Sequence, residues 1–215
     1  MRRRREEIRL EPVEYPTTRQ LDASVAPGAE ASTRINLSSE ITQLRLGPSG
    51  GTENGEVELQ RVSERDKTVL ANLLQLYRHD LSAERAIELT EHGTFIYRFL
   101  DHYFVDGGDR EADFIRDDGT LAGFIMTRLL SEGVREMSEF FVVRAHRRRG
   151  VGRRAAELVF RRHPGSWEVA FDDGTQGAAT FWQVVVAGAA KLPVRQRKAH
   201  PPERSFHQTV LRFST

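Results

Sequence analysis

The sequence has no cysteine among its 215 residues, and it lacks long hydrophobic runs. The first absence excludes disulfides, thiol catalysis, zinc ribbons and cysteine-ligated iron–sulfur clusters. The second excludes a membrane-spanning helix, which would need roughly 18 consecutive apolar residues. The basic residues 2–5 are followed by Glu6 and Glu7 and not by an apolar stretch, so no export signal is expected. We therefore predict a cytoplasmic protein with no membrane partner.

An excess of charge of one sign is missing as well. The 32 Lys and Arg residues balance 31 Asp and Glu residues to a net charge of +1, which offers no general attraction to nucleic acid. The seven histidines show no metal-ligand spacing, and neither H-E-x-x-H nor G-x-x-x-x-G-K-S/T occurs. We predict no metal site, no nucleoside triphosphatase activity and no nucleic-acid partner.

What remains is an ordinary globular composition that is unevenly distributed along the chain. Residues 1–55 hold eight Arg and eight acidic residues among scattered Pro, Gly, Ser and Thr, so we expect a poorly ordered or peripheral extension. Within it, residues 35–46 have enough apolar side chains for a strand or short helix. Residues 47–51 spell G-x-S-x-G, but no helix pattern follows, so they indicate a linker and not a nucleophilic serine. The folded domain is predicted over residues 56–215.

Hydrophobic periodicity divides this domain into alternating strands and helices. Strands are predicted at residues 56–62, 112–116, 121–129, 137–143, 167–171 and 206–213. Helices are predicted after Ser63, from Ser82 to residue 89, and at 150–163 and 178–186. The side chains expected to face inward are Val69, Leu70, Leu73, Leu74 and Tyr77 on the first helix, and Val151, Ala155, Leu158 and Val159 on the third. The turn at residues 117–119 predicts a hairpin, and the order β-α-α-β-β-β-α-β-α-β indicates an α/β (α+β) fold.

One strand runs into a cationic loop and then into a helix that begins with glycines. Residues 140–143 are apolar, residues 144–149 contain four Arg, and Gly150 and Gly152 open the helix. Main-chain N–H groups at a helix N-terminus are unpaired and the helix dipole there is positive, so a phosphate group can bind. Glycines let the ligand come close, and Arg side chains add charge-assisted bonds. The pattern predicts a pyrophosphate ligand; the alternative is a solvated Arg-rich loop.

The same glycines also fit a dinucleotide-binding fingerprint. Gly150, Gly152 and Ala155 match G-x-G-x-x-A, with Asp172 and Asp173 about 20 residues further on. In that fold the first glycine follows its strand almost at once, whereas six residues separate Val143 from Gly150 here. Fewer than 70 residues follow Gly150, too few to complete a doubly wound sheet. A nicotinamide or flavin site is therefore not expected.

The chain resembles the GNAT superfamily of acyl-CoA-dependent N-acetyltransferases. The signature of that superfamily, Q/R-x-x-G-x-G/A after a strand, is matched by Arg147, Gly150 and Gly152. The element order over roughly the last three-quarters of the chain is also similar. The runs at residues 139–143, 165–169 and 181–182 resemble a bacterial branch of predicted acetyltransferases. The resemblance implies a mixed, mostly antiparallel sheet flanked by helices.

The resemblance further implies acetyl-CoA as co-substrate. Main-chain N–H groups of the loop and helix start would bind its pyrophosphate, and a strand end that parts from its neighbour would pair with the pantetheine arm. Gln176 looks equivalent to an Asn that often opens the following helix in this superfamily. The residues implied for acetyl-CoA are Phe141, Val142, Val143, Arg147, Arg148, Arg149, Gly150, Val151, Gly152, Arg153 and Gln176.

Acetyl transfer needs a neutral amine, hence a base, and ideally an acid for the leaving thiolate. Glu139 is the candidate base, because GNAT enzymes often carry a catalytic Glu on the signature strand; the alternative is a capping or ion-pairing role within the sheet. The usual acid, a Tyr, is replaced by Trp182, which is expected to pack in the core or form a wall of the acyl pocket. Either Tyr97, Tyr103 or His207 supplies the proton, or solvent does, or activity is lost.

Residues 95–104 lie where the resemblance places a segment that lines the acceptor site. Tyr97 and Tyr103 are the expected substrate contacts, and an aromatic and acidic lining would suit a cationic amine; the alternative is plain core. Two functions follow: acetyl transfer from acetyl-CoA to a primary amine of unknown identity, or a catalytically silent acyl-CoA-binding or partner-binding module on the same fold. Both are compatible with a homodimer.

Overall fold

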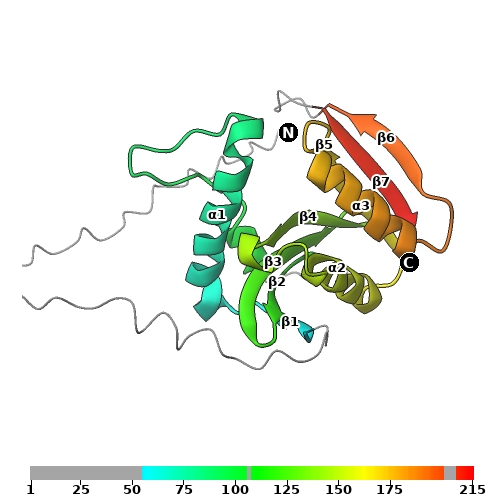
Figure 1. The fold of residues 1–215 in the computed structure, drawn as a ribbon, viewed down its shortest axis with the longest axis horizontal. Coiled ribbons are helices and arrows are strands. Elements are labelled where there is room, and N and C mark those ends of the chain that lie inside the picture. The colour runs from blue at the N-terminus through cyan, green and yellow to red at the C-terminus, as the bar shows by residue number, and fades with distance from the viewer. Residues whose placement is uncertain (1–54, 106–107, 201–206) are drawn as a thin grey trace, which may run out of the picture. The chain divides into compact units, whose positions relative to one another are not determined.

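The structure, a computed structural model, describes residues 55–105, 108–200 and 207–215 (Figure 1). The expectations for the N-terminal extension, its strand or helix at 35–46 and the linker at 47–51 lie outside the described residues. The elements are β1 (Val57–Arg61), α1 (Lys67–Arg85), β2 (Arg110–Asp117), β3 (Thr120–Leu129), β4 (Arg135–Val142), α2 (Val151–Arg162), β5 (Ser166–Asp172), α3 (Gln176–Ala189), β6 (Arg195–Ala199) and β7 (Gln208–Ser214).

The described strands form one seven-stranded sheet in the order β1-β2-β3-β4-β5-β7-β6. Strands β4 and β5 pair in parallel, and all the other neighbours pair antiparallel. One apolar core joins α1 to the sheet, and a second core joins α2 and α3 to it. Figure 1 shows α2 and α3 side by side and apart from α1. This architecture confirms the predicted mixed, mostly antiparallel sheet flanked by helices and differs from a doubly wound parallel sheet.

Local sequence explains the predicted elements that are confirmed. The β2–β3 hairpin turns at Asp118 and Gly119, which have φ angles of 51° and 75°, and two positive φ values are what a type I′ turn requires. Gly150, with φ 77°, lies immediately before α2 and is its N-cap. Strands β1, β4, β5 and β7 lie within a few residues of their predicted bounds.

The predicted second helix at 82–89 is wrong. Helix α1 continues through Ser82 and ends where Ala86 adopts a left-handed conformation, with φ 48°. The Ser82 hydroxyl donates a hydrogen bond to the carbonyl oxygen of His79 at 2.8 Å, so it bonds back within the helix and does not cap a new one. A serine in a helix and a serine before one look alike in sequence, and tertiary packing decides between them.

Two of the predicted inward faces need correction, and one strand was missed. Val69 is 40% exposed, because the buried stripe of α1 consists of Leu70, Leu73 and Leu74. On α2, Leu158 is only half-buried whereas Phe160 is buried.

The missed strand is β6, whose sequence RQRKA has no apolar alternation. Most of its side chains are exposed at the sheet edge, and the strand is held by backbone pairing with β7 and by ion pairs of Arg197 with Glu168 and Lys198 with Asp173.

Strand β4 follows β5 for only part of its length. The register pairs Arg135 with Trp167 and continues to Met137 with Val169. On the other side, β3 pairs Met126 with Glu139 but Thr127 with Met137, which leaves Ser138 as an extra residue in β4. Such a bulge bends a strand and increases its twist. Beyond the bulge, β4 stays paired with β3 while β5 pairs with β7, so a gap opens between β4 and β5.

Replacing Gly123 with alanine should destabilise the fold. A Cβ atom at Gly123 would lie 2.0 Å from the carbonyl oxygen of Phe141 in β4, and backbone cannot yield as a side chain does. We expect a loss of about 2 kcal/mol or more in the free energy of unfolding, measured by urea denaturation. Gly188→Ala, on an exposed position of α3 with open space around it, is the matched control and should be neutral or slightly stabilising. Equal stability of the two variants would contradict this account of β3–β4 packing.

Candidate functional site

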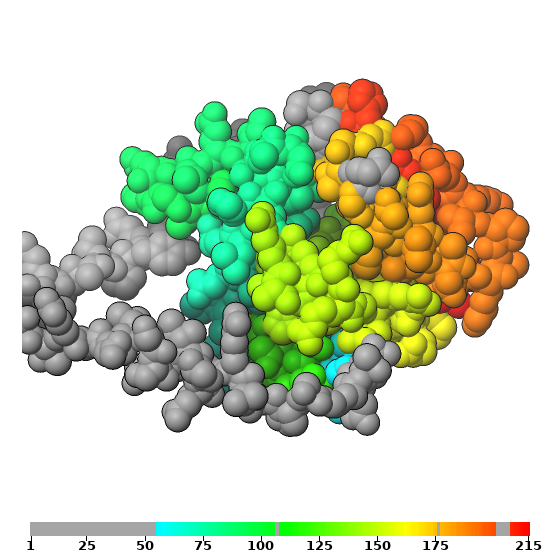
Figure 2. All heavy atoms as spheres, viewed as in Figure 1, coloured from blue at the N-terminus to red at the C-terminus, as the bar shows by residue number. Residues whose placement is uncertain are grey.

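A cavity of about 320 Å³ lies where β4 parts from β5. Figure 2 shows the surface hollowed between α1 and α3, with the loop that follows β4 beside it. The cavity is bounded by α1, the segment 97–103, β4, β5 and α3. Its polar and aromatic lining residues are Tyr77, Arg85, Tyr97, Phe99, Tyr103, Arg110, Arg128, Glu136, Ser138, Glu139, Phe140, Phe171, Asp172, Thr175, Trp182 and Gln208.

Glu139 follows the bulge in β4 and faces α1. Its carboxylate accepts a hydrogen bond from the Tyr77 hydroxyl at 2.6 Å and another from the Tyr97 hydroxyl at 3.1 Å. Tyr77 comes from the buried face of α1 and packs edge-on to Phe124 at 5.8 Å. The sequence placed Tyr77 on that inner face, but periodicity does not show that its hydroxyl reaches a carboxylate 62 residues away.

Both tyrosines that bond to Glu139 are held in their neutral form. Burial raises the pKa of Tyr77 well above its ordinary value, and the negative charge of Glu139 raises it further. The same two causes raise the pKa of Tyr97. Burial also raises the pKa of Tyr103, which lines the cavity nearby. A phenol with a pKa above 10 is a weaker acid than a thiol, whose ordinary pKa is about 8.5. These tyrosines therefore suit hydrogen bonding better than protonation of a thiolate.

A buried ion pair joins the last turn of α1 to the end of β5. Arg85 Nε lies 2.5 Å from Asp172 Oδ2, and both side chains line the cavity. Asp172 is 5% exposed and also accepts a hydrogen bond from Gln208 Nε2 at 2.9 Å. Asp172 was considered above only as the acidic residue of a dinucleotide site. It instead holds α1 and β5 together, a long-range pairing that no local pattern reveals.

The cationic loop after β4 is tied to α1 through Asp80. Arg144 Nη2 donates to Asp80 Oδ1 at 2.8 Å, and Arg147 Nη2 donates to Asp80 Oδ2. Arg147 also donates from Nε to the carbonyl oxygen of Val142 at 2.6 Å. Burial raises the pKa of Asp80, but the hydrogen bonds from Arg147 and Arg144 outweigh it and hold that pKa below its ordinary value. The Arg147 side chain is thus engaged within the protein.

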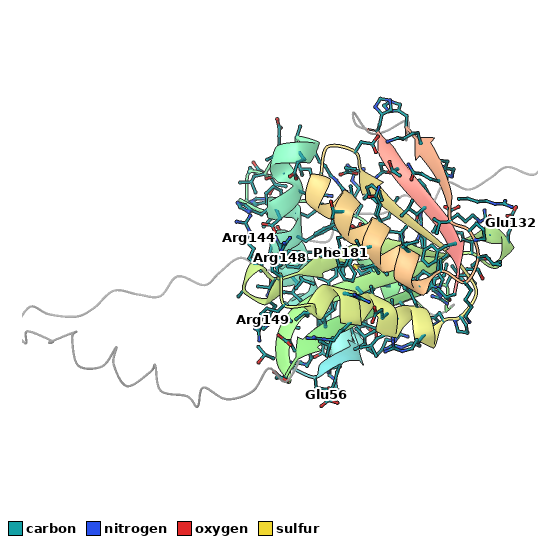
Figure 3. The ribbon with its side chains drawn as sticks, turned by 45° about the vertical axis from the view of Figure 1, so that its right-hand side comes forward. Glu56, Glu132, Arg144, Arg148, Arg149 and Phe181 are labelled. Atoms are coloured by element: carbon teal, nitrogen blue, oxygen red, sulfur yellow. The ribbon has the colours of Figure 1, made fainter. Side chains whose placement is uncertain are left out.

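A second carboxylate holds the loop from the hairpin side. Asp117 at the end of β2 is 3% exposed and lies 2.8 Å from His146 Nδ1. Arg149 and Arg154 lie 3.6 Å and 3.9 Å from the same carboxylate. Arg148 is exposed at the tip of the loop with φ 63°. Figure 3 shows the labels of Arg148 and of Phe181 in α3 beside each other, near the N-terminal end of α2.

The N-terminus of α2 presents unpaired main-chain donors. The N–H of Arg154 is the first to bond within the helix, to the carbonyl of Gly150 at 3.0 Å. The N–H groups of Val151, Gly152 and Arg153 precede it and have no acceptor inside an α-helix. A Cβ atom at Gly152 would lie 3.3 Å from Phe181 and 3.5 Å from Phe140, so the glycine allows these rings to approach the helix start.

The end of β4 has a mixed set of backbone contacts. The N–H of Val143 donates to the carbonyl of Ala122 at 2.8 Å, so it pairs toward β3. The carbonyl of Val142 accepts from Arg147, as described above. The Phe141 ring is buried against Tyr77 on the α1 face. On the side of this strand end that faces β5, the backbone groups border the gap because pairing with β5 has ended. The Val142 carbonyl is the one of them that Arg147 already occupies.

The remaining candidate residues are divided between the cavity and the surface. Tyr97 and Tyr103 line the cavity, and Trp182 lines it too while stacking edge-on to Phe140 at 5.0 Å. His207 is exposed, lies against His200 and is not part of the lining. Asp101 is also exposed and pairs with Lys67 at 2.9 Å, so the acidic residue of segment 95–104 lies outside the cavity. Gln176 begins α3, and its side chain is outside what the structure describes.

Within the described ranges, no three His, Asp or Glu side chains are grouped so that they could hold a metal ion. No helix in that part of the chain is long and apolar enough to cross a membrane.

Tyrosine ionisation offers a direct test of the site's electrostatics. We expect Tyr77, Tyr97 and Tyr103 to stay protonated near pH 10, the ordinary tyrosine pKa, because burial raises all three pKa values. A pKa that is raised in the folded state contributes stability below the unfolded pKa, and this contribution is lost as the pH rises through the folded pKa. Tyrosinate absorbance followed with circular dichroism should therefore show these residues ionising together with unfolding. Ionisation of all three near pH 10 in a native chain would contradict the assignment.

Replacing Asp80 with asparagine should loosen the cationic loop. Because Arg144 and Arg147 are exposed, we expect the free energy of unfolding to fall by about 1 kcal/mol or less. Amide hydrogen exchange of residues 144–149 should nevertheless become faster. Asp101→Asn, which removes an exposed ion pair outside the cavity, is the control and should leave that exchange unchanged. Unchanged exchange in Asp80→Asn would show that the loop is held by other contacts.

Comparison with known proteins places this geometry in a family. Residues 70–183, more than half of the chain, match the family described as Acetyltransferase (GNAT) family. No curated protein matches the sequence. Among solved structures, an acetyltransferase from Thermus thermophilus is 18% identical with a TM-score of 0.53 and covers 72% of this chain and 95% of its own. A GCN5-related N-acetyltransferase from Kribbella flavida is 14% identical with a TM-score of 0.51 and covers 74% and 98%.

These structural likenesses show that the fold is shared. The family match spans α1 through the first half of α3, and so includes the signature loop, Glu139 and most of the strands that form the cavity. The protein therefore belongs to the GNAT acetyltransferase family.

Proposed function

We propose that this protein transfers an acetyl group from acetyl-CoA to a primary amine. The observation that carries the proposal is the carboxylate of Glu139, which accepts hydrogen bonds from Tyr77 and Tyr97 in the cavity where β4 parts from β5. A part-buried carboxylate, a cavity and an opened strand end meet at one place, which supports the proposal. Residues 56–215 would form the acetyltransferase domain and residues 1–55 a peripheral extension.

The residues present fit acetyl-CoA, which supplies the acetyl thioester when bound. The N–H groups of Val151, Gly152 and Arg153 suit a pyrophosphate, and Arg148, Arg149 and Arg153 are exposed around them. We assign the side chain of Arg147 to the loop and not to the phosphates, because it is already bonded to Asp80 and Val142. The backbone of Phe141, Val142 and Val143 would lie beside the pantetheine arm, and Gln176 would lie at the start of α3.

Glu139 would remove the proton from the amine as it attacks the thioester, directly or through a water. The two tyrosine hydroxyls fix the carboxylate in place and remain neutral, because burial keeps their pKa values high. Tyr97 and Tyr103 are poor acids for the same reason, and His207 is outside the cavity. Trp182 stands where the usual acid, a Tyr, would be, so another source of the proton is needed. Of the sources considered, protonation of the leaving thiolate by solvent is the one that this geometry favours.

A catalytically silent acyl-CoA-binding module is the second candidate. The observation that favours it is Trp182, which is 6% exposed in the cavity wall, where it cannot act as an acid. Such a module would bind acetyl-CoA and release no free CoA when an amine is added.

Replacing Glu139 with glutamine separates the two candidates. For an enzyme, amine-dependent release of free CoA should fall about 100-fold in kcat, because a base contributes roughly that factor. The shift of the thermal midpoint by acetyl-CoA should persist, since the proposed contacts with acetyl-CoA come from the loop, the start of α2 and the strand backbone and not from the Glu139 side chain. Glu58→Gln, on an exposed position of β1, is the matched control and should keep full activity.

Each other outcome contradicts a stated part of the proposal. Full activity in Glu139→Gln would remove the assigned base. Binding of acetyl-CoA by the unaltered protein with no CoA release for any amine would favour the silent module.

A further inference from the structure

A row of charged side chains crosses one end of the cavity. Arg110 on β2 is the register partner of Arg128 on β3, and Arg128 is the partner of Glu136 on β4. All three line the cavity that also contains Glu139. Arg128 is two residues from Met126, the register partner of Glu139, so the row lies about 7 Å along the strands from Glu139.

The ion pairs in this cavity neutralise two of its carboxylates. Glu136 pairs with Arg128, and Asp172 pairs with Arg85 at 2.5 Å. Neither carboxylate is therefore available to attract a cationic group. Of the three carboxylates that line the cavity, Glu139 is then the one at which the amine group of an acceptor would lie, and nothing in the described lining favours a second cationic group.

Arg110 is the cation of the row without a carboxylate partner. Its guanidinium lies 5.5 Å from the centre of the Tyr103 ring, and no Asp or Glu of the described ranges lies within 4.0 Å of it. The residue is half-buried and lines the cavity. A guanidinium presents several donors in a planar fork that matches a carboxylate. Partial burial strengthens the interaction between the two charges.

Resting on the proposed function, we infer that the acceptor is an amine that also carries a carboxylate. The amine would lie at Glu139 and the carboxylate at Arg110, with the Tyr97 and Tyr103 rings beside the carbon chain between them. Because the row and Glu139 are separated by about 7 Å, the preferred acceptor should have several covalent bonds between its amine nitrogen and its carboxylate. A diamine would place its second ammonium against Arg110, and like charges at that distance repel.

The test is a comparison of matched acceptors. Straight-chain amino carboxylates of increasing length are each assayed for CoA release beside the neutral amide and the diamine of the same length. We expect kcat/KM for the preferred carboxylate to exceed that for its amide by about tenfold or more, the usual range for a hydrogen bond to a charged group. In Arg110→Gln the two should become nearly equal, mainly through a higher KM for the carboxylate.

A matched control variant tests whether the effect is local. Arg116→Gln removes another half-buried arginine of β2, which bonds to Gln60 and to the carbonyl of Gly119 and does not line the cavity. It should keep the wild-type preference for the carboxylate. Arg110→Glu should reverse the preference toward the diamine, which a loss of folding would not produce.

The three ways in which the test can fail are distinguishable. Equal or faster acetylation of the amides or diamines by the unaltered protein would overturn the inferred acceptor class while leaving acetyl transfer established. A carboxylate preference that survives in Arg110→Gln would overturn the role of Arg110. A failure to release CoA with acceptors of every type would overturn the proposed function together with this inference.

Discussion

The parting of β4 from β5 is the constraint on which the rest of the site depends. The extra residue at Ser138 bends β4 just after its last pair with β5. Past that point, alternation sends Glu139 toward the tyrosines of α1 and segment 97–103, and Phe140 toward the aromatic rings of α3. A continuously paired strand would have closed the sheet there. One bulge therefore creates the cavity and directs both a carboxylate and an apolar wall toward it.

The arginine-rich loop serves structure as much as charge. Asp80 holds it from α1 and Asp117 holds it from the hairpin, so two buried or partly buried carboxylates fix opposite sides of the loop. Arg147 uses its guanidinium to bond to Asp80 and to the carbonyl of Val142. A loop fixed in this way presents main-chain donors in a preset arrangement, and less conformational entropy is lost when an anion binds. The signature arginine thus supports the backbone that would bind the ligand.

Much of the fold could be predicted, because local patterns specify it. Asp118 and Gly119 define a turn, and Gly150 precedes a strongly amphipathic helix. The end of α1 could not be predicted, since Ala86 carries no stop signal in its side chain. Strand β6 could not be predicted because it has no apolar alternation and is defined by backbone pairing with β7 and by ion pairs of Arg197 and Lys198 with distant carboxylates. For the site, Glu139 and the tyrosines Tyr97 and Tyr103 were named in advance, whereas Tyr77, Arg85 and Arg110 were not. Tyr77 and Arg85 have partners far away in sequence, Glu139 and Asp172, which periodicity does not encode.

The ion pair of Arg85 and Asp172 shows what such a long-range contact contributes. Replacing a buried ion pair by apolar groups is often neutral or stabilising, so stability alone does not explain its presence. Its position does: Arg85 ends α1 and Asp172 ends β5, on opposite walls of the cavity. Because β4 and β5 no longer share backbone hydrogen bonds there, a directional side-chain contact is needed to fix the width of the gap. Arg85 also neutralises Asp172, and Glu139, the carboxylate proposed above as the base, is held in the same cavity by two neutral tyrosines.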